Sequence, residues 1–217
     1  MQRPVWAVSL AALLLATVAP SRVFGEAMIL VRPDQRAIPM LVSKSQVSKS
    51  EILLHYGTGV IVGHATILTA EHVLAGRMEV RLPKVTVTSR AVCRARYADL
   101  AVLSAPLPKG TPYYRVSYRM PGVGEAVRVG GYPDRHWTVA RGRVTHVIQS
   151  ATLGGRSVHA QMIVFEPALR HGASGSPVLD GEGRVVGIFV ASNMQANYSV
   201  AFPTATSLRS CSKFLSQ

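Results

Sequence analysis

Short apolar runs alternate with turn residues along most of the chain, and this pattern predicts strands rather than long helices. The first hairpin runs from Ile52 through Gly57-Thr58-Gly59 into 60–62, turns at Gly63-His64 and returns over 65–69. Comparable runs follow at a spacing of about 8–12 residues, as in all-β barrels and sandwiches. They cover 78–82, 85–87, 91–97, 100–103, 123–131, 137–147, 158–165, 185–191 and 198–202.

Three segments depart from this pattern. Residues 105–122 are rich in Pro, Gly and Tyr, and we interpret them as the connection between two halves of the chain. Residues 204–215 place apolar side chains at helical spacing, which predicts a short C-terminal helix. Residues 26–50 mix apolar pieces with prolines and a Ser/Lys-rich run, and predict a partly flexible N-terminal extension.

The beginning of the chain has the order of a secretory signal peptide. One cation, Arg3, precedes an apolar run over 5–19, and small residues follow up to Gly25. We expect cleavage after Gly25 or Ala27 and export of the protein to the periplasm or beyond. An uncleaved membrane anchor is the alternative, although 15 residues fall short of the roughly 20 that a spanning helix needs.

The chain is strongly basic. It carries 24 Lys and Arg against 11 Asp and Glu, and loss of residues 1–25 removes two of the cations, leaving 22 minus 11, or +11. Such a surface favours anionic partners, such as anionic envelopes or acidic substrates. Nucleic acid is not expected, because no basic run is combined with a platform of stacking aromatics. The charge therefore biases the choice of partner without naming a function.

The two cysteines, Cys93 and Cys211, are compatible with a disulfide in an exported protein and equally with a buried pair of free thiols. Neither has the small-residue and His context of a nucleophilic cysteine. The seven histidines are not clustered with cysteines or acids in a ligand pattern. We expect no metal site and no cofactor.

Candidate chemistry begins at Gly172-Ala173-Ser174-Gly175-Ser176-Pro177. Small residues let the backbone turn sharply there and approach a substrate closely. Ser174 is the candidate nucleophile, and the N–H groups of Gly172 and Ser174 are candidates for an oxyanion hole. A plain Gly/Ser surface turn is the alternative, and a serine nucleophile still needs a base and an orienting acid.

His72 and Asp99 are the candidates for these two roles. His72 follows a predicted strand and has the pKa range of a general base. Two aspartates lie between His72 and Ser174, namely Asp99 and Asp134. Asp134 follows Pro133 in a turn, where Asp is common. Asp99 opens an apolar strand and has no turn to form, so it is the better orienting acid.

Taken together, these segments resemble the trypsin/chymotrypsin-like serine proteases, especially bacterial members such as the Deg/high-temperature-requirement group. His, Asp and Ser occur in the family's order, at separations of 27 and 75 residues, and the resemblance covers about 50–215. The matching motifs are GTGVIVGHATILTAEHVL, DLAVL, GEAVRVGGYP, GASGSPVLDGEGRVVGIF and VAFP.

The resemblance implies two six-stranded antiparallel β-barrels, with the active site in the cleft between them and a short C-terminal helix. The expected organisation is a signal peptide (1–25), the extension (26–50) and a protease domain (51–217). Within the protease domain we expect barrel one at about 51–105, a connection over 106–122, barrel two at about 123–203 and a helix at about 204–216.

Carried over by position, the resemblance implies that Ser174 is the nucleophile, His72 the general base and acid, and Asp99 the residue that orients His72. Two departures stand out. Ala173 replaces the Asp that pairs with a new N-terminus in many digestive members, and Val73 replaces a common cysteine. No PDZ module is expected after Gln217.

Specificity follows from the residues that match the family's substrate pocket. Ala168 replaces the acid of trypsin-like members, so cleavage after Lys or Arg is not expected. Val190, Ala191 and Tyr198 predict a small apolar pocket, and His171 lies either at its polar edge or in solvent. The backbone of Ala191-Ser192 is expected to pair with an extended peptide.

The sequence thus predicts an exported serine endopeptidase that prefers small or aliphatic residues before the scissile bond and acts on polypeptides. The alternative is a non-catalytic relative, in which a protease fold binds anionic surfaces or peptides through its charge. A hydrolase with a Gly-x-Ser-x-Gly elbow is disfavoured, because residue 176 is Ser. The oligomeric state stays open.

Overall fold

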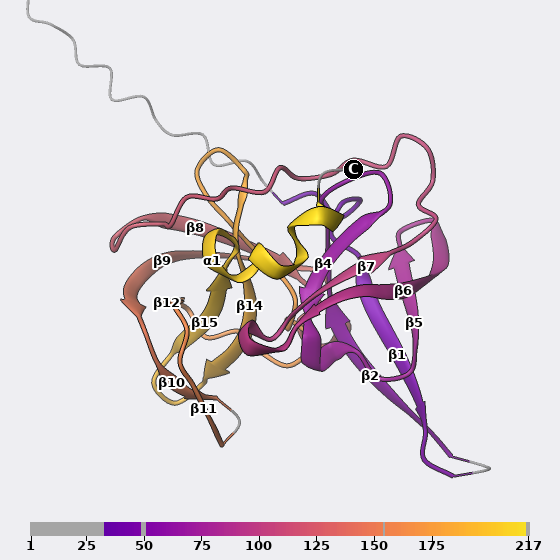
Figure 1. Cartoon of the computed structure of the whole chain (residues 1–217), viewed down its shortest axis with the longest axis horizontal. Coiled ribbons are helices and arrows are strands. Elements are labelled where there is room, and N and C mark those ends of the chain that lie inside the picture. Colours follow the sequence, from indigo (N-terminus) through magenta and orange to yellow (C-terminus); the bar gives the residue numbers. More distant parts are fainter. Residues whose placement is uncertain (1–32, 49–50, 154, 216–217) are drawn as a thin grey trace, which may run out of the picture.

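The computed structural model describes residues 33–48, 51–153 and 155–215, and about half of them lie in β-strands. The strands form two halves that lie side by side (Figure 1). In this part of the chain no helix is long and apolar enough to cross a membrane. The predicted signal peptide lies outside the described residues.

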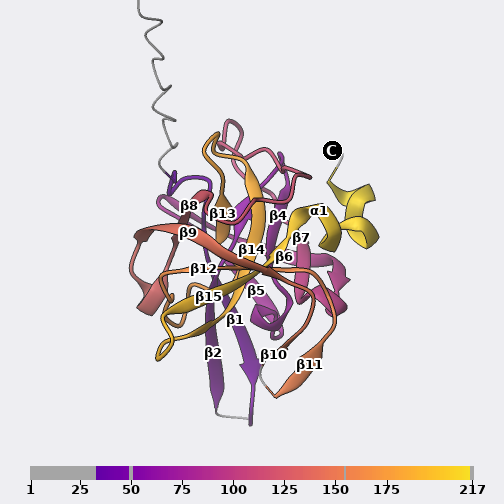
Figure 2. The same cartoon turned by 90° about the vertical axis from the view of Figure 1, so that its left-hand side faces the viewer.

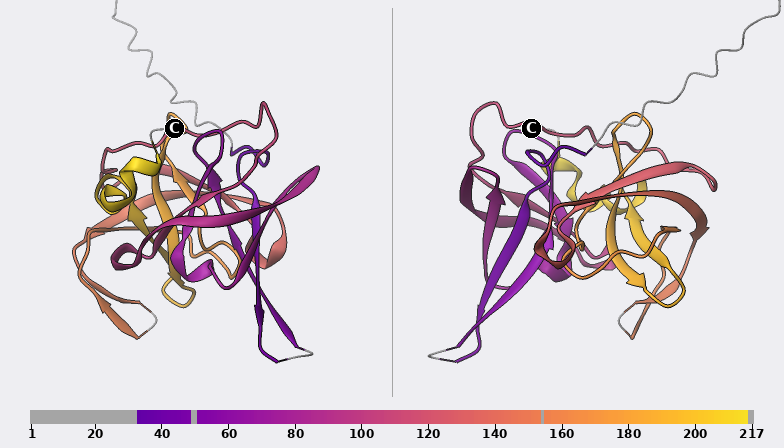
Figure 3. Two further views of the ribbon diagram at one scale, coloured as in Figure 1. Left: turned by 45° about the vertical axis from the view of Figure 1, so that its right-hand side comes forward. Right: turned by 180° about the vertical axis from the view of Figure 1, so that it is seen from behind.

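The first half is one antiparallel sheet in the order β2-β1-β5-β6-β7-β4-β3. Gly59 alone separates β2 from β3, although these two strands are the opposite edges of the sheet. The sheet therefore curls into a half-barrel whose edges are consecutive pieces of chain (Figure 3). Its strands are β1 (Met40–Gln46), β2 (Ile52–Thr58), β3 (Val60–Ile61), β4 (Thr66–Ala70), β5 (Arg77–Leu82), β6 (Val85–Ala95) and β7 (Leu100–Ser104).

The second half is a closed barrel in the order β12-β15-β14-β13-β8-β9 (Figure 2). A separate two-stranded ribbon, β10 with β11, is inserted between β9 and β12. The prediction of an all-β, two-barrel fold is confirmed. The strands are β8 (Ala126–Gly131), β9 (Thr138–Ile148), β10 (Ala151–Leu153), β11 (Arg156–Val158), β12 (Met162–Glu166), β13 (Pro177–Leu179), β14 (Val185–Asn193) and β15 (Tyr198–Pro203).

In the described part of the chain, one of two clusters of buried apolar side chains spans both halves, and the other lies within the second half. The cluster that spans both halves includes Leu68 of β4, Ile188 of β14 and Phe202 of β15. Removing this surface from water stabilises the contact between the halves as well as each half. The loops at the junction of the halves are therefore attached to strands whose side chains are closely packed.

The N-terminal boundary differs from the expectation. Within the range assigned to a flexible extension, Met40–Gln46 is β1, which pairs with β2 on one side and β5 on the other. Leu41 and Val42 are fully buried, and so is the polar Ser43 between them and Lys44. Ser43 donates its hydroxyl to the Val73 carbonyl at 3.0 Å, so a residue that indicates a loop in the sequence lies in the core.

The C-terminal segment is also less regular than predicted. It begins with a four-residue α-helix, α1 (Thr204–Ser207), and continues as a 3-10 helix, η4 (Arg209–Phe214). Thr, Ser and Cys dominate here and have low helix propensity, which explains why a longer α-helix does not form.

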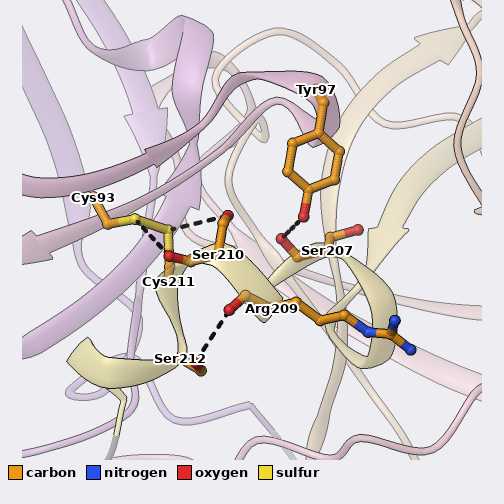
Figure 4. Close-up of a disulfide and its surroundings, with 7 residues drawn as sticks. All are labelled: Cys93, Tyr97, Ser207, Arg209, Ser210, Cys211 and Ser212. Atoms are coloured by element: carbon orange, nitrogen blue, oxygen red, sulfur yellow. Dashed lines mark hydrogen bonds between the residues drawn. A yellow bond between two sulfur atoms is a disulfide. The ribbon is translucent and has the colours of Figure 1, made fainter.

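A disulfide ties this segment to the first half (Figure 4). Cys93 of β6 is bonded to Cys211 of η4, with 5.8 Å between their Cα atoms. A hydrogen bond joins the same segments: the Tyr97 hydroxyl donates to the Ser207 carbonyl at 2.9 Å. Of the two states that the sequence left open for the cysteines, the structure has the disulfide.

Candidate active site

His72 is presented by a short 3-10 helix, η1 (Glu71–Val73), directly after β4. Val73 is buried and anchors this turn in the core, whereas the His72 side chain keeps 46% of its surface exposed. The imidazole is therefore held on a fixed turn but stays within reach of a substrate.

Asp99 binds His72 at two atoms. The His72 backbone N–H donates to Oδ1 at 2.9 Å, and ring atom Nδ1 lies 2.6 Å from Oδ2. The Asp99 carbonyl also accepts the Glu71 N–H at 2.9 Å. Asp99 has a left-handed backbone (φ 44°), which Asp tolerates better than most residues. With Nδ1–H turned to the carboxylate, Nε2 is left to accept a proton.

The Ser174 loop depends on glycines. Gly172 and Gly175 have φ values of 90° and 88°. A Cβ at Gly175 would clash with the Thr58 carbonyl oxygen, and a Cβ at Gly172 would clash with the Tyr132 carbonyl oxygen. The loop is therefore packed closely on both sides, and its conformation requires Gly at these two positions.

From Gly172 to Gly175, the backbone N–H groups are in turn available to a ligand and bonded within the protein. Ala173 N–H donates to the Arg170 carbonyl at 3.2 Å, and Gly175 N–H donates to the Phe189 carbonyl at 2.8 Å. Within the described residues, no hydrogen bond uses the N–H groups of Gly172 or Ser174. These are the two amides that the sequence analysis assigned to an oxyanion hole.

His72 and Ser174 line the same open cavity of about 580 Å³. No hydrogen bond joins their side chains in the described part of the chain; such bonds often tighten only when substrate binds. Of the predicted substrate-binding residues, His171, Val190, Ala191 and Ser192 line this cavity, whereas Ala168 and Tyr198 do not. The other lining residues are Asp134, Leu169, Arg170, Phe189 and Met194.

Asp134, which the sequence pattern predicted to be only a turn residue, lines the cavity of His72 and Ser174. It does lie in a turn, with φ 50°, but its carboxylate pairs with Arg170 Nε at 3.1 Å. Its N–H also donates to the His171 carbonyl at 2.7 Å. The contacts join loops more than 30 residues apart in the sequence, and no local pattern signals them.

His72 also lines a second cavity, of about 460 Å³. The β10–β11 ribbon contributes Leu153 and Val158 to its wall, and Val190 and Ala191 are shared with the first cavity. In the described residues, no group of three or more His, Cys, Asp or Glu is arranged to hold a metal ion.

Comparison with known sequences identifies a family. A model described as a trypsin-like peptidase domain matches residues 57–188, more than half of the chain. The uncharacterized protein y4bJ of Sinorhizobium fredii (strain NBRC 101917 / NGR234) is 31% identical over 152 residues, covering 67% of this chain and 23% of that protein. The chain thus spans less than a quarter of the length of this curated relative.

Solved structures share the fold. The Rv3671c protease from M. tuberculosis, in its active form, aligns with a TM-score of 0.71 and 21% identity over 81% of each chain. The HtrA-type protease AlgW with a tripeptide gives 0.70 and 23%, over 84% of this chain and 61% of that one. The serine endoprotease from Yersinia pestis gives 0.65 and 22%, over 85% and 68%. At these identities, the likeness is one of fold.

Proposed function

Since the chain belongs to the trypsin-like peptidase family, we propose that it is a serine endopeptidase in which Ser174, His72 and Asp99 form the catalytic triad. The observation that carries this proposal is the two-point contact between Asp99 and His72, beside a serine whose loop leaves two amides available. A carboxylate bound to Nδ1 and a serine in the same cavity are the parts that acyl transfer needs.

In the proposed reaction, Ser174 Oγ attacks the scissile carbonyl carbon while His72 Nε2 takes the hydroxyl proton. The N–H groups of Gly172 and Ser174 donate to the oxyanion that forms. The C–N bond then breaks, and the leaving amine receives the proton from His72. Water hydrolyses the acyl-enzyme by the same steps, with His72 as base, and Ser174 is regenerated.

The proposed substrates are polypeptides with small or medium aliphatic residues before the scissile bond. Leu169, Phe189, Val190 and Ala191 give the cavity apolar walls. The Ser192 hydroxyl is already bonded to the Leu169 carbonyl at 2.6 Å, so it does not add a free donor. Arg170 and His171 make the remainder of the lining more polar.

A substrate backbone has a strand edge to pair with. β14 runs over Val185–Asn193, but β13 pairs only with residues 185–188 of it. Phe189 on this edge of β14 is bonded to Ser176 and Gly175, and from Val190 onward the edge has no ladder partner among the described strands. This edge adjoins the cavity through Val190, Ala191 and Ser192, so strand addition would place a peptide across Ser174.

The second candidate is a non-catalytic relative that uses the fold to bind peptides or anionic surfaces. The observation that favours it is the net positive charge, which is +13 for the whole chain and +11 without residues 1–25. Export, expected from the signal-peptide pattern, suits either candidate.

Labelling with a fluorophosphonate probe separates the two candidates. We expect wild-type protein to be labelled at Ser174, and labelling to disappear in Ser174→Ala and to fall steeply in His72→Ala. Circular dichroism of each variant controls for folding. A well-folded wild type that stays unlabelled would exclude the endopeptidase and leave the binding protein.

A further inference from the structure

Thr58 lies at the junction between the halves, as the last residue of β2. Its side chain is fully buried, and Gly57 and Gly59 flank it. Because β2 belongs to the first half and the Ser174 loop to the second, any bond from Thr58 to that loop crosses between the halves.

Four hydrogen bonds converge on Thr58. Its N–H donates to the Ser174 carbonyl at 2.8 Å, and its hydroxyl donates to the Gly172 carbonyl at 2.9 Å. The hydroxyl also accepts the Tyr132 N–H at 3.0 Å. Its carbonyl accepts the Thr69 hydroxyl at 2.7 Å, which fixes Thr58 to β4 next to η1. Thr58 therefore binds both residues whose amides face the proposed oxyanion.

These bonds matter because a peptide unit is planar, so fixing its carbonyl also fixes the direction of the following N–H. The His171 carbonyl is held by Asp134 N–H, and the Ala173 carbonyl by Ser176 N–H at 2.9 Å. Thr58 holds the two carbonyls that alternate with them, those of Gly172 and Ser174, and so fixes the peptide planes that adjoin those of the two oxyanion donors. All four peptide planes from His171 to Gly175 are thereby fixed, two of them by one residue of the other half.

We propose that Thr58 is a positioning residue, whose buried hydroxyl sets the orientation of the loop that supplies the oxyanion donors. The inference rests on the proposed function for its effect on rate. The hydroxyl does two things that an apolar side chain of equal size cannot do: it donates to Gly172 and accepts from Tyr132. Without it, both groups lose a partner, and the peptide plane between the two oxyanion donors, which carries the Gly172 carbonyl, is no longer held from the first half.

The test compares Thr58→Val, which keeps the shape without the hydroxyl, with Thr58→Ser, which keeps the hydroxyl. The control is Thr204→Val. Thr204 is also fully buried, and its hydroxyl donates to the Ser117 carbonyl at 2.5 Å, away from the cavity. We expect Thr58→Val to slow fluorophosphonate labelling about 10- to 100-fold, somewhat less than removal of a whole oxyanion donor. In peptide hydrolysis kcat should fall with KM nearly unchanged.

Thr58→Ser should stay within about 3-fold of wild type, well inside the loss expected for a missing donor. Thr204→Val should lose thermal stability without losing rate. Labelling of Thr58→Val at the wild-type rate, or equal slowing in both valine variants, would overturn the proposal. If Thr58→Val does not fold, Thr58→Cys keeps a weak donor and should give an intermediate rate.

Amide hydrogen exchange keeps the inference separate from the proposed function. Thr58→Val should speed exchange over 171–176 relative to wild type, and Thr204→Val should not. A wild type that is not labelled would refute the endopeptidase, while faster exchange confined to Thr58→Val would still support the positioning role. Unchanged exchange over 171–176 would refute it.

Discussion

The two halves hold their parts of the candidate site by different means. In the first half, one residue positions the base: the Asp99 carboxylate binds both the ring and the backbone N–H of His72, and the Asp99 carbonyl accepts the Glu71 N–H. In the second half, the Ser174 loop is held through its backbone, by left-handed glycines and by carbonyls that accept from several loops. One substitution can remove a side-chain contact, whereas the conformation of a backbone depends on the φ values it adopts and on the space around it.

This difference has a chemical reason. A general base must keep one tautomer and one ring orientation, and a single charged acceptor provides both. Both candidate donors of the oxyanion hole are backbone N–H groups, so their direction depends on the conformation of the backbone itself. The first half is therefore expected to be sensitive to charge, and the second to added atoms.

The largest effect is expected from Asp99→Asn in the first half. The amide keeps the size of the side chain, but it no longer offers two anionic acceptors to His72, so the favoured tautomer is lost. Peptide hydrolysis should fall about 10⁴-fold. Steady-state kinetics on a peptide substrate measure this, with Glu79→Gln, on β5 and outside both cavities, as a control for loss of an acid. A fall below tenfold would contradict the role of Asp99.

The matching test of the second half is Gly175→Ala. The added methyl group meets the Thr58 carbonyl, and φ of 88° is costly for alanine. Clash and backbone strain together should lower the free energy of unfolding by about 2–4 kcal/mol and should abolish most labelling of Ser174. Urea unfolding measures the first and the fluorophosphonate probe the second.

Gly110→Ala is the control, because Gly110 has φ of 80° but no atom within 4 Å of the added Cβ. It should cost only about 1–2 kcal/mol from the backbone alone. Equal losses in the two variants would show that the conformation matters and the close packing against Thr58 does not.

The same contrast explains what the sequence could predict. His72, Asp99 and Ser174 lie in short motifs beside predicted strands, and the strand pattern predicts an all-β chain in two halves, whereas the two-barrel fold was implied by the family resemblance. The structure places His72 and Asp99 in contact, as the sequence analysis expected. Each motif is recognised from residues near one another in the chain, and the order of the motifs supplied the rest.

What the sequence could not predict depends on contacts between distant loops. Asp134 looked like a turn residue and also pairs with Arg170 at the rim of the cavity. Ala168 was expected to line that cavity, yet its N–H donates to Asn197 Oδ1 at 3.1 Å and the residue lies outside the lining. β1 was missed because Ser43, in its middle, is a buried polar residue satisfied by Val73 from another segment. Pairing of Cys93 with Cys211 likewise needed the fold.

The smallest effect is expected from removing a charge in the second half, because the Ser174 loop is held through its backbone and not by any one acid. Glu125 is bound by Arg119 at 2.5 and 2.8 Å and by the Gly122 N–H at 3.0 Å, and the hydrogen bond to Arg119 lowers the pKa of this carboxyl, against the effect of burial. Because the folded-state pKa lies below the unfolded value, this stabilisation is present above about pH 4.5 and is lost as the pH falls through the folded pKa.

Glu125→Gln should therefore lower the free energy of unfolding by about 1 kcal/mol at pH 7 and by less near pH 3. Urea unfolding between these pH values measures both, and labelling of Ser174 should not change. A large loss of labelling would show that the second half, like the first, relies on a single carboxylate.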